Sequence, residues 1–223
     1  MHPCSTLLTA IDRYLARFDA AHAGIAKCRQ GVARLSAKAV ATGATATGAT
    51  ATGARPARYL AEAVALARQQ GGDALMDALM ACPAEWQIYD SYPAADIGPS
   101  FPKRHAFVCL GAMLDPAWSL DFDLGFLLIQ PHTLYRDHHH AASELYVPLT
   151  GPSRWRFGAD TPWSSVDAHQ PIWNEPNAVH ATLVGETPLL CLYAWTENVL
   201  APAFVDRAKD WVTIEAGFDK ADA

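Results

Sequence analysis

Residues 135–151, YRDHHHAASELYVPLTG, carry the clearest signal for the fold of this chain. They hold three of the nine histidines in a row, and a glutamate follows four residues after the last of them. Imidazole and carboxylate groups together suit a divalent transition metal such as zinc, iron, manganese, cobalt or nickel. Side chains on one face of a strand recur at every second residue, so we expect His138 and His140 on one face and His139 on the other.

Two further residues extend this constellation. A tight connection after His140 would start a new strand and return Glu144 to the same side, and Tyr146 then points the same way if no bulge interrupts the strand. A fourth ligand must come from elsewhere in the chain. His180 is the best candidate, because it begins a β-rich run after the turn in PNAVHATLV, residues 176–184. The pattern predicts one metal ion bound by His138, His140, Glu144 and His180.

The segments around this motif read as strands. From Trp86 onward, short β-rich runs alternate with Pro, Gly, Asp and Asn; the runs are HAFVCLGAML, LGFLLIQ, ELYVPLTG, SRWRFG, HATLVG and PLLCLYAW. Many short strands at this spacing are typical of an all-β sandwich or barrel, whereas a βαβ fold needs helices between its strands. We therefore expect a small β-barrel or jelly roll over residues 85–202.

The N-terminal part, residues 1–84, reads as a helical extension. Apolar residues recur at helical spacing from Ser5 to about Arg34, and a second helical stretch from about Pro56 to Met80 contains a break at Gly71-Gly72. The small-residue repeat TGATATGATATGA predicts a flexible insertion over about 41–55. We expect the extension to cover one end of the barrel or to act as a dimerisation arm, and the tail, residues 203–223, to be helical.

Composition excludes several classes of protein. The net charge of −6, from 17 basic and 23 acidic residues, lacks the basic surface of a nucleic-acid binder. The five cysteines form no CxxC pair, which argues against a disulfide framework and a thiolate zinc site. Asp12 and Arg13 interrupt any signal-peptide stretch, and no apolar run is long enough to span a bilayer. We expect no membrane partner and a cytoplasmic location.

The metal-ligand pattern resembles a known family motif. His138-x-His140-x-x-x-Glu144, followed by Gly151, is similar to the first cupin motif, and His180 falls where the second motif supplies its histidine. The resemblance implies a double-stranded β-helix, the jelly-roll barrel of cupins, with the metal inside. Two positions depart from it: His132 stands where the first motif has a glycine, and residues 176–180, PNAVH, lack the glycine of the second.

A narrower resemblance covers roughly residues 85–200. The strings PHTLYRDHHHAASELYVPLTGPSRW (131–155) and PNAVHATLVGETPLLCLYAW (176–195), together with the helical extension, resemble the cupin-type dimethylsulfoniopropionate (DMSP) lyases. Tyr146, two residues after Glu144, is the most telling element. This resemblance implies a carbon–sulfur lyase of the dimethylpropiothetin dethiomethylase type, which cleaves DMSP to dimethyl sulfide and acrylate with one divalent metal ion.

The implied substrate is a small zwitterionic sulfonium carboxylate, which assigns roles to particular aromatic residues. Tyr146 is the expected base, because contact with a divalent cation favours the phenolate. Tyr135 is the second candidate, as an alternative base or as a substrate clamp. A sulfonium favours an aromatic face, and Tyr193 and Trp195 share one strand face in PLLCLYAW, so either is a candidate substrate contact. His132 and His139 are expected outside the metal site or in support of its ligands.

Two other functions remain open from the sequence. A cupin dioxygenase or isomerase acting on a small carboxylate would use the same four ligands and would not need Tyr146. A non-catalytic cupin sensor would hold a small acid in the barrel, but it would have no need to retain the ligands. A homodimer is compatible with the sequence, which by itself does not determine the oligomeric state or the identity of the metal.

Overall fold

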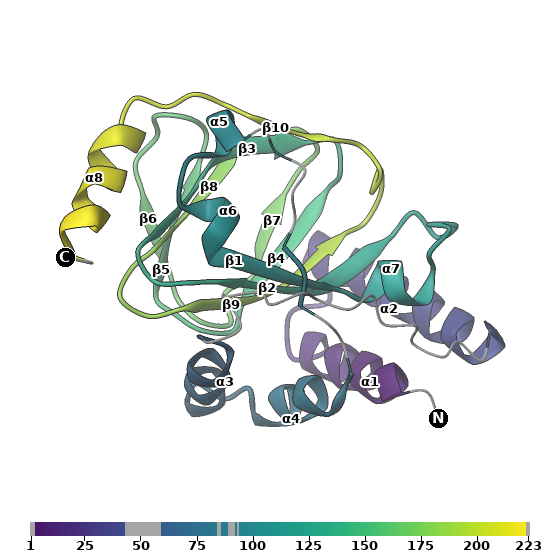
Figure 1. Cartoon of the computed structure of the whole chain (residues 1–223). Coiled ribbons are helices and arrows are strands. Elements are labelled where there is room, and N and C mark those ends of the chain that lie inside the picture. Colours follow the sequence, from purple (N-terminus) through teal and green to yellow (C-terminus); the bar gives the residue numbers. More distant parts are fainter. Residues whose placement is uncertain (1–2, 43–58, 84–85, 89–91, 93, 222–223) are drawn as a thin grey trace.

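Two antiparallel β-sheets of five strands each face one another in the computed structural model (Figure 1), which describes residues 3–42, 59–83, 86–88, 92 and 94–221. The first sheet contains, in spatial order, β1 (His105–Cys109), β2 (Asp123–Ile129), β9 (Leu189–Trp195), β4 (Glu144–Pro148) and β7 (Ile172–Asn174). The second contains β10 (Ala203–Val205), β3 (Thr133–His140), β8 (His180–Val184), β5 (Ser153–Phe157) and β6 (Ser164–Val166).

The chain winds back and forth between the two sheets. From β2 to β5, and again from β6 to β10, each strand lies in the opposite sheet from the strand before it. This alternation is the winding of a jelly roll, the architecture to which cupins belong. The predicted fold class, a cupin double-stranded β-helix with helices added at the N-terminus, is confirmed.

The first sheet is buried on both faces. In β2, Leu124 and Leu128 belong to the apolar cluster shared with the N-terminal helices, whereas Leu127 and Ile129 belong to the cluster inside the barrel. Successive side chains of a strand alternate between the two faces of the sheet. Because one face packs against the helices and the other against the barrel interior, the strand sequence is apolar at nearly every position. Residues on the inner face therefore point toward the second sheet across the barrel interior.

Four helices cover the outer face of the first sheet (Figure 1): α1 (Pro3–Leu15), α2 (Ala23–Thr42), α3 (Leu60–Gln69) and α4 (Asp73–Ala81). The break between α3 and α4 lies where Gly71-Gly72 predicts it, and Gly71 has a φ of 100°, which glycine adopts without strain. The prediction of one helix from Ser5 to Arg34 is wrong at residues 16–22. There, the Asp19 carboxylate accepts a hydrogen bond from the Ala21 backbone N–H (2.8 Å) and stabilises a turn. Nearly all of the expected insertion lies outside the described residues.

Four further helices lie around the barrel: α5 (Ala94–Ile97), α6 (Phe101–Arg104), α7 (Leu110–Leu114) and α8 (Trp211–Ala221). The expectation of a helical tail is wrong for Ala203–Val205, which form β10 and pair with residues 138–140 of β3. Hydrogen-bond donors and acceptors in β3 that would otherwise lie at a sheet edge favour this pairing. None of the described helices is long and apolar enough to cross a membrane.

The C-terminal segment is attached to the second sheet through buried charges. Arg156 on β5 forms ion pairs with Asp137 on β3 and, at 2.8 Å, with Asp210. Trp211, the first residue of α8, donates its indole N–H to Asp137 over 2.7 Å. All five cysteines are free, and the thiols of Cys4 and Cys82 lie 3.1 Å apart, joining the start of α1 to the residue after α4.

Candidate active site

Three histidines converge inside the barrel. β3 carries His138 and His140, β8 carries His180, and the backbone of His138 pairs directly with that of His180. One ring nitrogen of each lies within 4.8 Å of the others, and all three side chains are buried. His139 points away and contacts Asp206 (2.5 Å), as the alternation along the strand predicts.

The backbone orients all three rings. The Nδ1–H of each donates to a carbonyl oxygen two residues away, namely to Arg136 (2.7 Å), Ala142 (2.9 Å) and Ala178 (2.9 Å). With Nδ1 protonated, the lone pair of a neutral imidazole is on Nε2, which faces the common point. The Nε2 atom of His138 is buried and has no hydrogen-bond partner among the described residues, whereas the Nε2 atoms of His140 and His180 face the Glu144 carboxylate. Such convergent, carbonyl-oriented imidazoles suit a transition metal ion.

Glu144 adds a carboxylate to this group from β4 in the other sheet. Its Oε2 lies 3.0 Å from His140 Nε2 and 3.2 Å from His180 Nε2, while Trp195 donates to Oε1 over 2.8 Å. Burial opposes ionisation of Glu144, but the two histidines outweigh it and hold its pKa well below the usual value. Burial and the neighbouring imidazoles lower the pKa of His138, so this ring is neutral and able to act as a ligand.

The two departures from the cupin motifs are explained by local backbone geometry. His132 has a φ of 53° and Asn177 a φ of 61°, the left-handed conformation that glycine favours. Asparagine and histidine tolerate this conformation better than most other residues. The Asn177 N–H also donates to the carbonyl of His140 over 2.8 Å, linking the turn before His180 to the other ligand-bearing strand. Both turns are therefore formed without the glycine.

A β-bulge brings Tyr135 into the same interior. The pairing of β3 with β8 shifts register between Tyr135 and His138, so these residues, three apart, both face inward. The Tyr135 ring stacks on His138 with centroids 4.0 Å apart and on Phe101 at 3.8 Å. Its hydroxyl is hydrogen-bonded to that of Tyr92 at 2.8 Å. The bulge thus places a phenol directly beside the histidines.

These groups border a cavity of about 130 Å³. That volume is well below the roughly 300–1,000 Å³ of sites for drug-sized ligands, so the cavity suits a small molecule. Six residues singled out in the sequence line it: Tyr135, His140, Glu144, Tyr146, Tyr193 and Trp195. The wall of the cavity therefore contains two of the four predicted metal ligands and all the predicted catalytic and substrate residues. The other two predicted ligands, His138 and His180, are buried beside His140.

Tyr146 and Tyr193 face each other as neighbours in the first sheet. They are register partners on β4 and β9, and Tyr146 lies 6.1 Å from the His180 ring between centroids. The strand parity expected from Glu144 to Tyr146 is confirmed, because no bulge interrupts β4 where it pairs with β9. Burial, the Glu144 charge and a hydrogen bond to Glu144 raise the pKa of Tyr146 well above its usual value.

Sequence reasoning missed six residues of the cavity wall: Tyr92, Phe107, Cys109, Trp118, Asp123 and Val199. Of these, Asp123 carried a usable signal, because a carboxylate opens the run DLGFLLI, whose remaining residues are glycine and apolar residues of a buried strand. A carboxylate in such a strand is seldom buried without a reason. The other five come from segments whose approach to the barrel depends on the tertiary fold.

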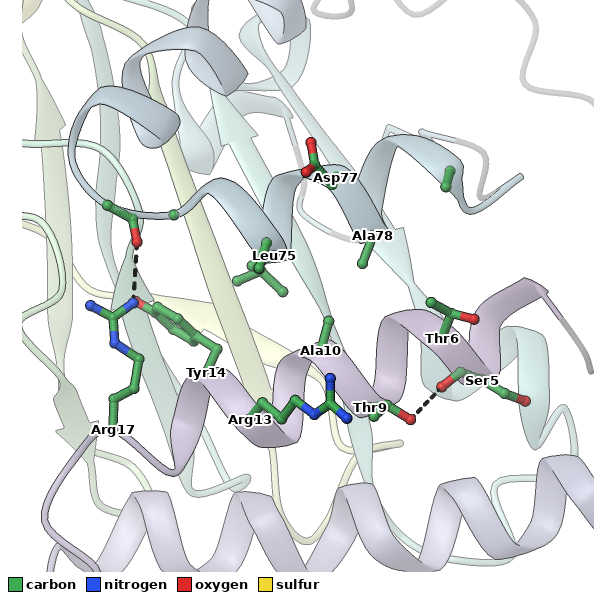
Figure 2. A pocket seen from close by; sticks show the side chains of 14 residues that line it. Ser5, Thr6, Thr9, Ala10, Arg13, Tyr14, Arg17, Leu75, Asp77 and Ala78 are labelled. Carbon is green, nitrogen blue, oxygen red and sulfur yellow. Dashed lines mark hydrogen bonds between the residues drawn. The ribbon is translucent and has the colours of Figure 1, made fainter.

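A larger cavity, of about 770 Å³, lies between α1 and α4 (Figure 2). Tyr14 and Leu75 line it, and Arg17 donates to the Gly71 carbonyl at its edge over 3.2 Å. It shares no lining residue with the cavity at the histidines. Among the described residues, the side chains that could hold a metal ion come together inside the barrel and not in the wall of this larger cavity.

Comparison with known proteins agrees with this geometry. A family model described as dimethylsulfoniopropionate lyase matches residues 28–191. Among solved structures, a chain from the crystal structures of the DMSP lyases RdDddP and RnDddQII aligns at a TM-score of 0.60 and 20% identity, over 92% of this chain and 98% of that one. The DMSP lyase DddQ from Ruegeria pomeroyi DSS-3 aligns at a TM-score of 0.52 and 20% identity, over 80% and 95%. No curated protein sequence matches.

Proposed function

Because the chain belongs to the dimethylsulfoniopropionate lyase family, we propose that it cleaves DMSP to dimethyl sulfide and acrylate by β-elimination. The observation that carries this proposal is the position of Tyr146. Its phenol lies in the wall of a small cavity beside Glu144 and the three converging histidines. A base next to a metal-ligand group is the arrangement that removal of a weakly acidic proton requires.

In this proposal His138, His140, Glu144 and His180 hold one divalent transition metal ion. The support is the donor set: three buried histidines that converge, of which His138 is neutral, and a carboxylate whose ionised form is favoured. When bound, such an ion supplies positive charge that favours the phenolate of a nearby tyrosine and stabilises negative charge developing on the substrate. This ligand set accepts several metals, which leaves zinc, iron, manganese, cobalt and nickel as candidates.

Tyr146 acts as the base. Its phenolate oxygen takes a proton from the carbon next to the substrate carboxylate, and the electron pair of that C–H bond forms the double bond of acrylate. The C–S bond breaks, and its electron pair leaves with sulfur as neutral dimethyl sulfide. Burial and the ionised Glu144 raise the pKa of Tyr146, so the phenolate is disfavoured until positive charge offsets these effects.

The other aromatic residues position the substrate. Tyr135 is held between Phe101 and His138 with its hydroxyl bonded to Tyr92, which suits a clamp and also leaves it as the second candidate base. Tyr193 and Trp195 face the cavity from β9, where their rings can contact a sulfonium group. Residues 85–202 form the catalytic barrel in this proposal and residues 1–84 support it; a cytoplasmic location and a homodimer stay predictions.

The reaction itself is tested directly. Purified protein loaded with each candidate metal in turn is incubated with DMSP, and dimethyl sulfide in the headspace is measured with and without a chelator. The proposal expects gas release that the chelator abolishes. If no metal gives dimethyl sulfide, the DMSP assignment is wrong.

Replacing Tyr146 tests the mechanism. We expect Tyr146→Phe to lower kcat by roughly 10²- to 10⁴-fold, the usual contribution of a general base, with metal content unchanged. Tyr135→Phe is the matched variant, because it removes the other phenol oxygen at the same metal site; it should mainly raise KM. A large loss of kcat in Tyr135→Phe with Tyr146→Phe still active would assign the base to Tyr135.

A further inference from the structure

A buried carboxylate lies in the cavity wall away from the metal-ligand group. Asp123 opens β2, where its backbone pairs with Trp195 on β9, and Trp195 pairs in turn with Glu144 on β4. Register partners in a sheet share a face, so the side chains of Asp123 and Glu144 face the same interior. Two strand spacings separate them, about 10 Å between backbones. Both line the same cavity.

Asp123 is held firmly by hydrogen-bond donors. Its Oδ1 accepts from the Leu124 N–H over 2.8 Å, and its Oδ2 accepts from the Tyr193 hydroxyl over 3.0 Å. The Gly111 N–H donates as well, and a Cβ on Gly111 would lie 2.4 Å from Oδ1, so only glycine permits this approach. The position and rotation of this carboxylate are therefore determined by the surrounding fold.

Among the described residues, no cationic side chain forms an ion pair with Asp123, although only 8% of the surface of this residue is exposed. Buried acidic side chains are normally paired, because an isolated charge is costly inside a protein. Burial raises the pKa of Asp123 to about 6 in spite of its three donors. A carboxylate kept in this state is suited to a cationic ligand.

The surroundings of Asp123 also suit a soft cation. Phe107, Trp118 and Tyr193 line the same cavity, and the Phe107 and Tyr193 rings meet edge to face with centroids 5.4 Å apart. Aromatic faces attract cations through the ring quadrupole. Trp118 has a φ of 51°, a conformation that a bulky residue adopts only when its surroundings impose it.

We propose that Asp123 is the specificity-determining residue for the cationic end of the substrate: its carboxylate faces the sulfonium while the substrate carboxylate lies toward His140 and Glu144. This inference deepens the proposed function and rests on it. One end of the cavity then attracts a cationic group and the other attracts a carboxylate. This arrangement matches a zwitterion whose charges are separated by two methylene groups.

The chemistry of the reaction predicts how Asp123 affects the kinetics. The sulfonium loses its positive charge as the C–S bond breaks, so attraction to Asp123 is stronger in the bound substrate than in the transition state. An interaction of that kind lowers KM without raising kcat. Removing the charge should therefore weaken binding and leave the chemical step as fast or faster, whereas loss of a base would lower kcat.

The test compares Asp123→Asn with Asp121→Asn, which removes the same formal charge from an exposed position two residues away. For Asp123→Asn we expect KM for DMSP to rise roughly 10- to 100-fold with kcat unchanged or higher. The inhibition constant of 4-methylpentanoate, which keeps the shape and the carboxylate of DMSP but has an uncharged CH group in place of the sulfonium, should change little. Asp121→Asn should leave both kinetic constants within about threefold of the wild type, the scale of weak surface electrostatics. If Asp123→Asn instead turns over about 100-fold more slowly with an unchanged KM, the inference is overturned.

A binding experiment separates failure of this inference from failure of the lyase assignment. Calorimetry needs no turnover and compares 3-(trimethylammonio)propanoate, a zwitterion, with 4,4-dimethylpentanoate, a carboxylate of the same shape whose tert-butyl end is uncharged. The wild type should prefer the zwitterion, and Asp123→Asn should lose that preference. If the wild type releases no dimethyl sulfide but shows this pattern, the lyase assignment fails and the role of Asp123 stands. If Asp123→Asn keeps the wild-type preference, the inference is wrong whatever the reaction.

Discussion

Each of the converging histidines is oriented by a carbonyl two residues away in the chain. Such a contact is local, and it uses Nδ1 of every ring, so that Nε2 is the nitrogen turned toward the common point. The orientation of the site is thus encoded beside each ligand. Its convergence is different in kind, because it requires β3, β4 and β8 to meet across two sheets.

At the same scale, Asp123 predicts a pH-dependent stability. Its pKa rises from 3.8 to about 6 on folding, so between these values the folded state binds more protons than the unfolded state. The contribution of Asp123 to stability is then fully present below pH 3.8 and is lost as the pH rises toward 6. Above pH 6 this one group lowers the free energy of unfolding by about 3 kcal/mol, because each pH unit between the two pKa values costs roughly 1.36 kcal/mol.

Asp123→Asn should remove this loss. We expect the free energy of unfolding of the variant, relative to that of the wild type, to be higher at about pH 7.5 than at about pH 3.5 by up to about 3 kcal/mol, measured in the presence of a chelator. Urea unfolding of both proteins at the two pH values measures the gain. An equal difference at both would mean that Asp123 titrates alike in the folded and unfolded chain.

Among the elements, α2 shows how closely the helical layer packs on the barrel. A Cβ on Gly31 would lie 2.2 Å from the ring of buried Phe122, and one on Gly24 would lie 2.4 Å from Trp173. These glycines cost helix propensity, yet they allow the helix backbone to approach the sheet. Because of these glycines, helix propensity alone predicts this packed helix only weakly.

Replacing Gly31 therefore tests the docking of α2. Gly31→Ala should destabilise the protein by about 1–3 kcal/mol through overpacking. Gly217→Ala in α8 is the matched control, because a Cβ at this position would meet nothing within 4 Å and alanine should stabilise that helix by about 0.5–1 kcal/mol. Denaturant unfolding gives both values. A stabilising Gly31→Ala would show that α2 does not pack against Phe122 in this way.

For the molecule as a whole, the metal site joins the two sheets. His138, His140 and His180 lie on the second sheet and Glu144 on the first, so an ion bound by all four would hold the folded barrel together. A ligand that binds only the folded state raises stability by mass action.

We expect added zinc at about 100 times its Kd to stabilise the wild type by about 2.7 kcal/mol, and a chelator to reverse this. His140→Ala should abolish the effect. His139→Ala, its neighbour on the opposite strand face, should keep it, since His139 contacts Asp206 and not the cavity. Thermal unfolding with and without metal measures the three proteins. Equal metal responses in His139→Ala and His140→Ala would contradict the proposed ligands.

Periodicity and residue type sufficed for much of this protein. Alternation placed His138 and His140 on one face of β3 and Glu144 with Tyr146 on one face of β4, and the turn before His180 marked the start of β8. These are short-range features, because the strand period acts over neighbouring residues. The barrel class followed from the number and spacing of the short strands.

The tertiary structure decided what depends on distant contacts. The bulge that turns Tyr135 inward arises from the pairing of β3 with β8, and the strand β10 exists because β3 offers it a partner. Asp123 became part of the cavity only when β2 paired with β9 and Gly111 approached from α7. A single sequence shows which residues can carry chemistry, but which of them meet depends on pairings between segments far apart in the chain, because contact energies between such segments leave no local pattern.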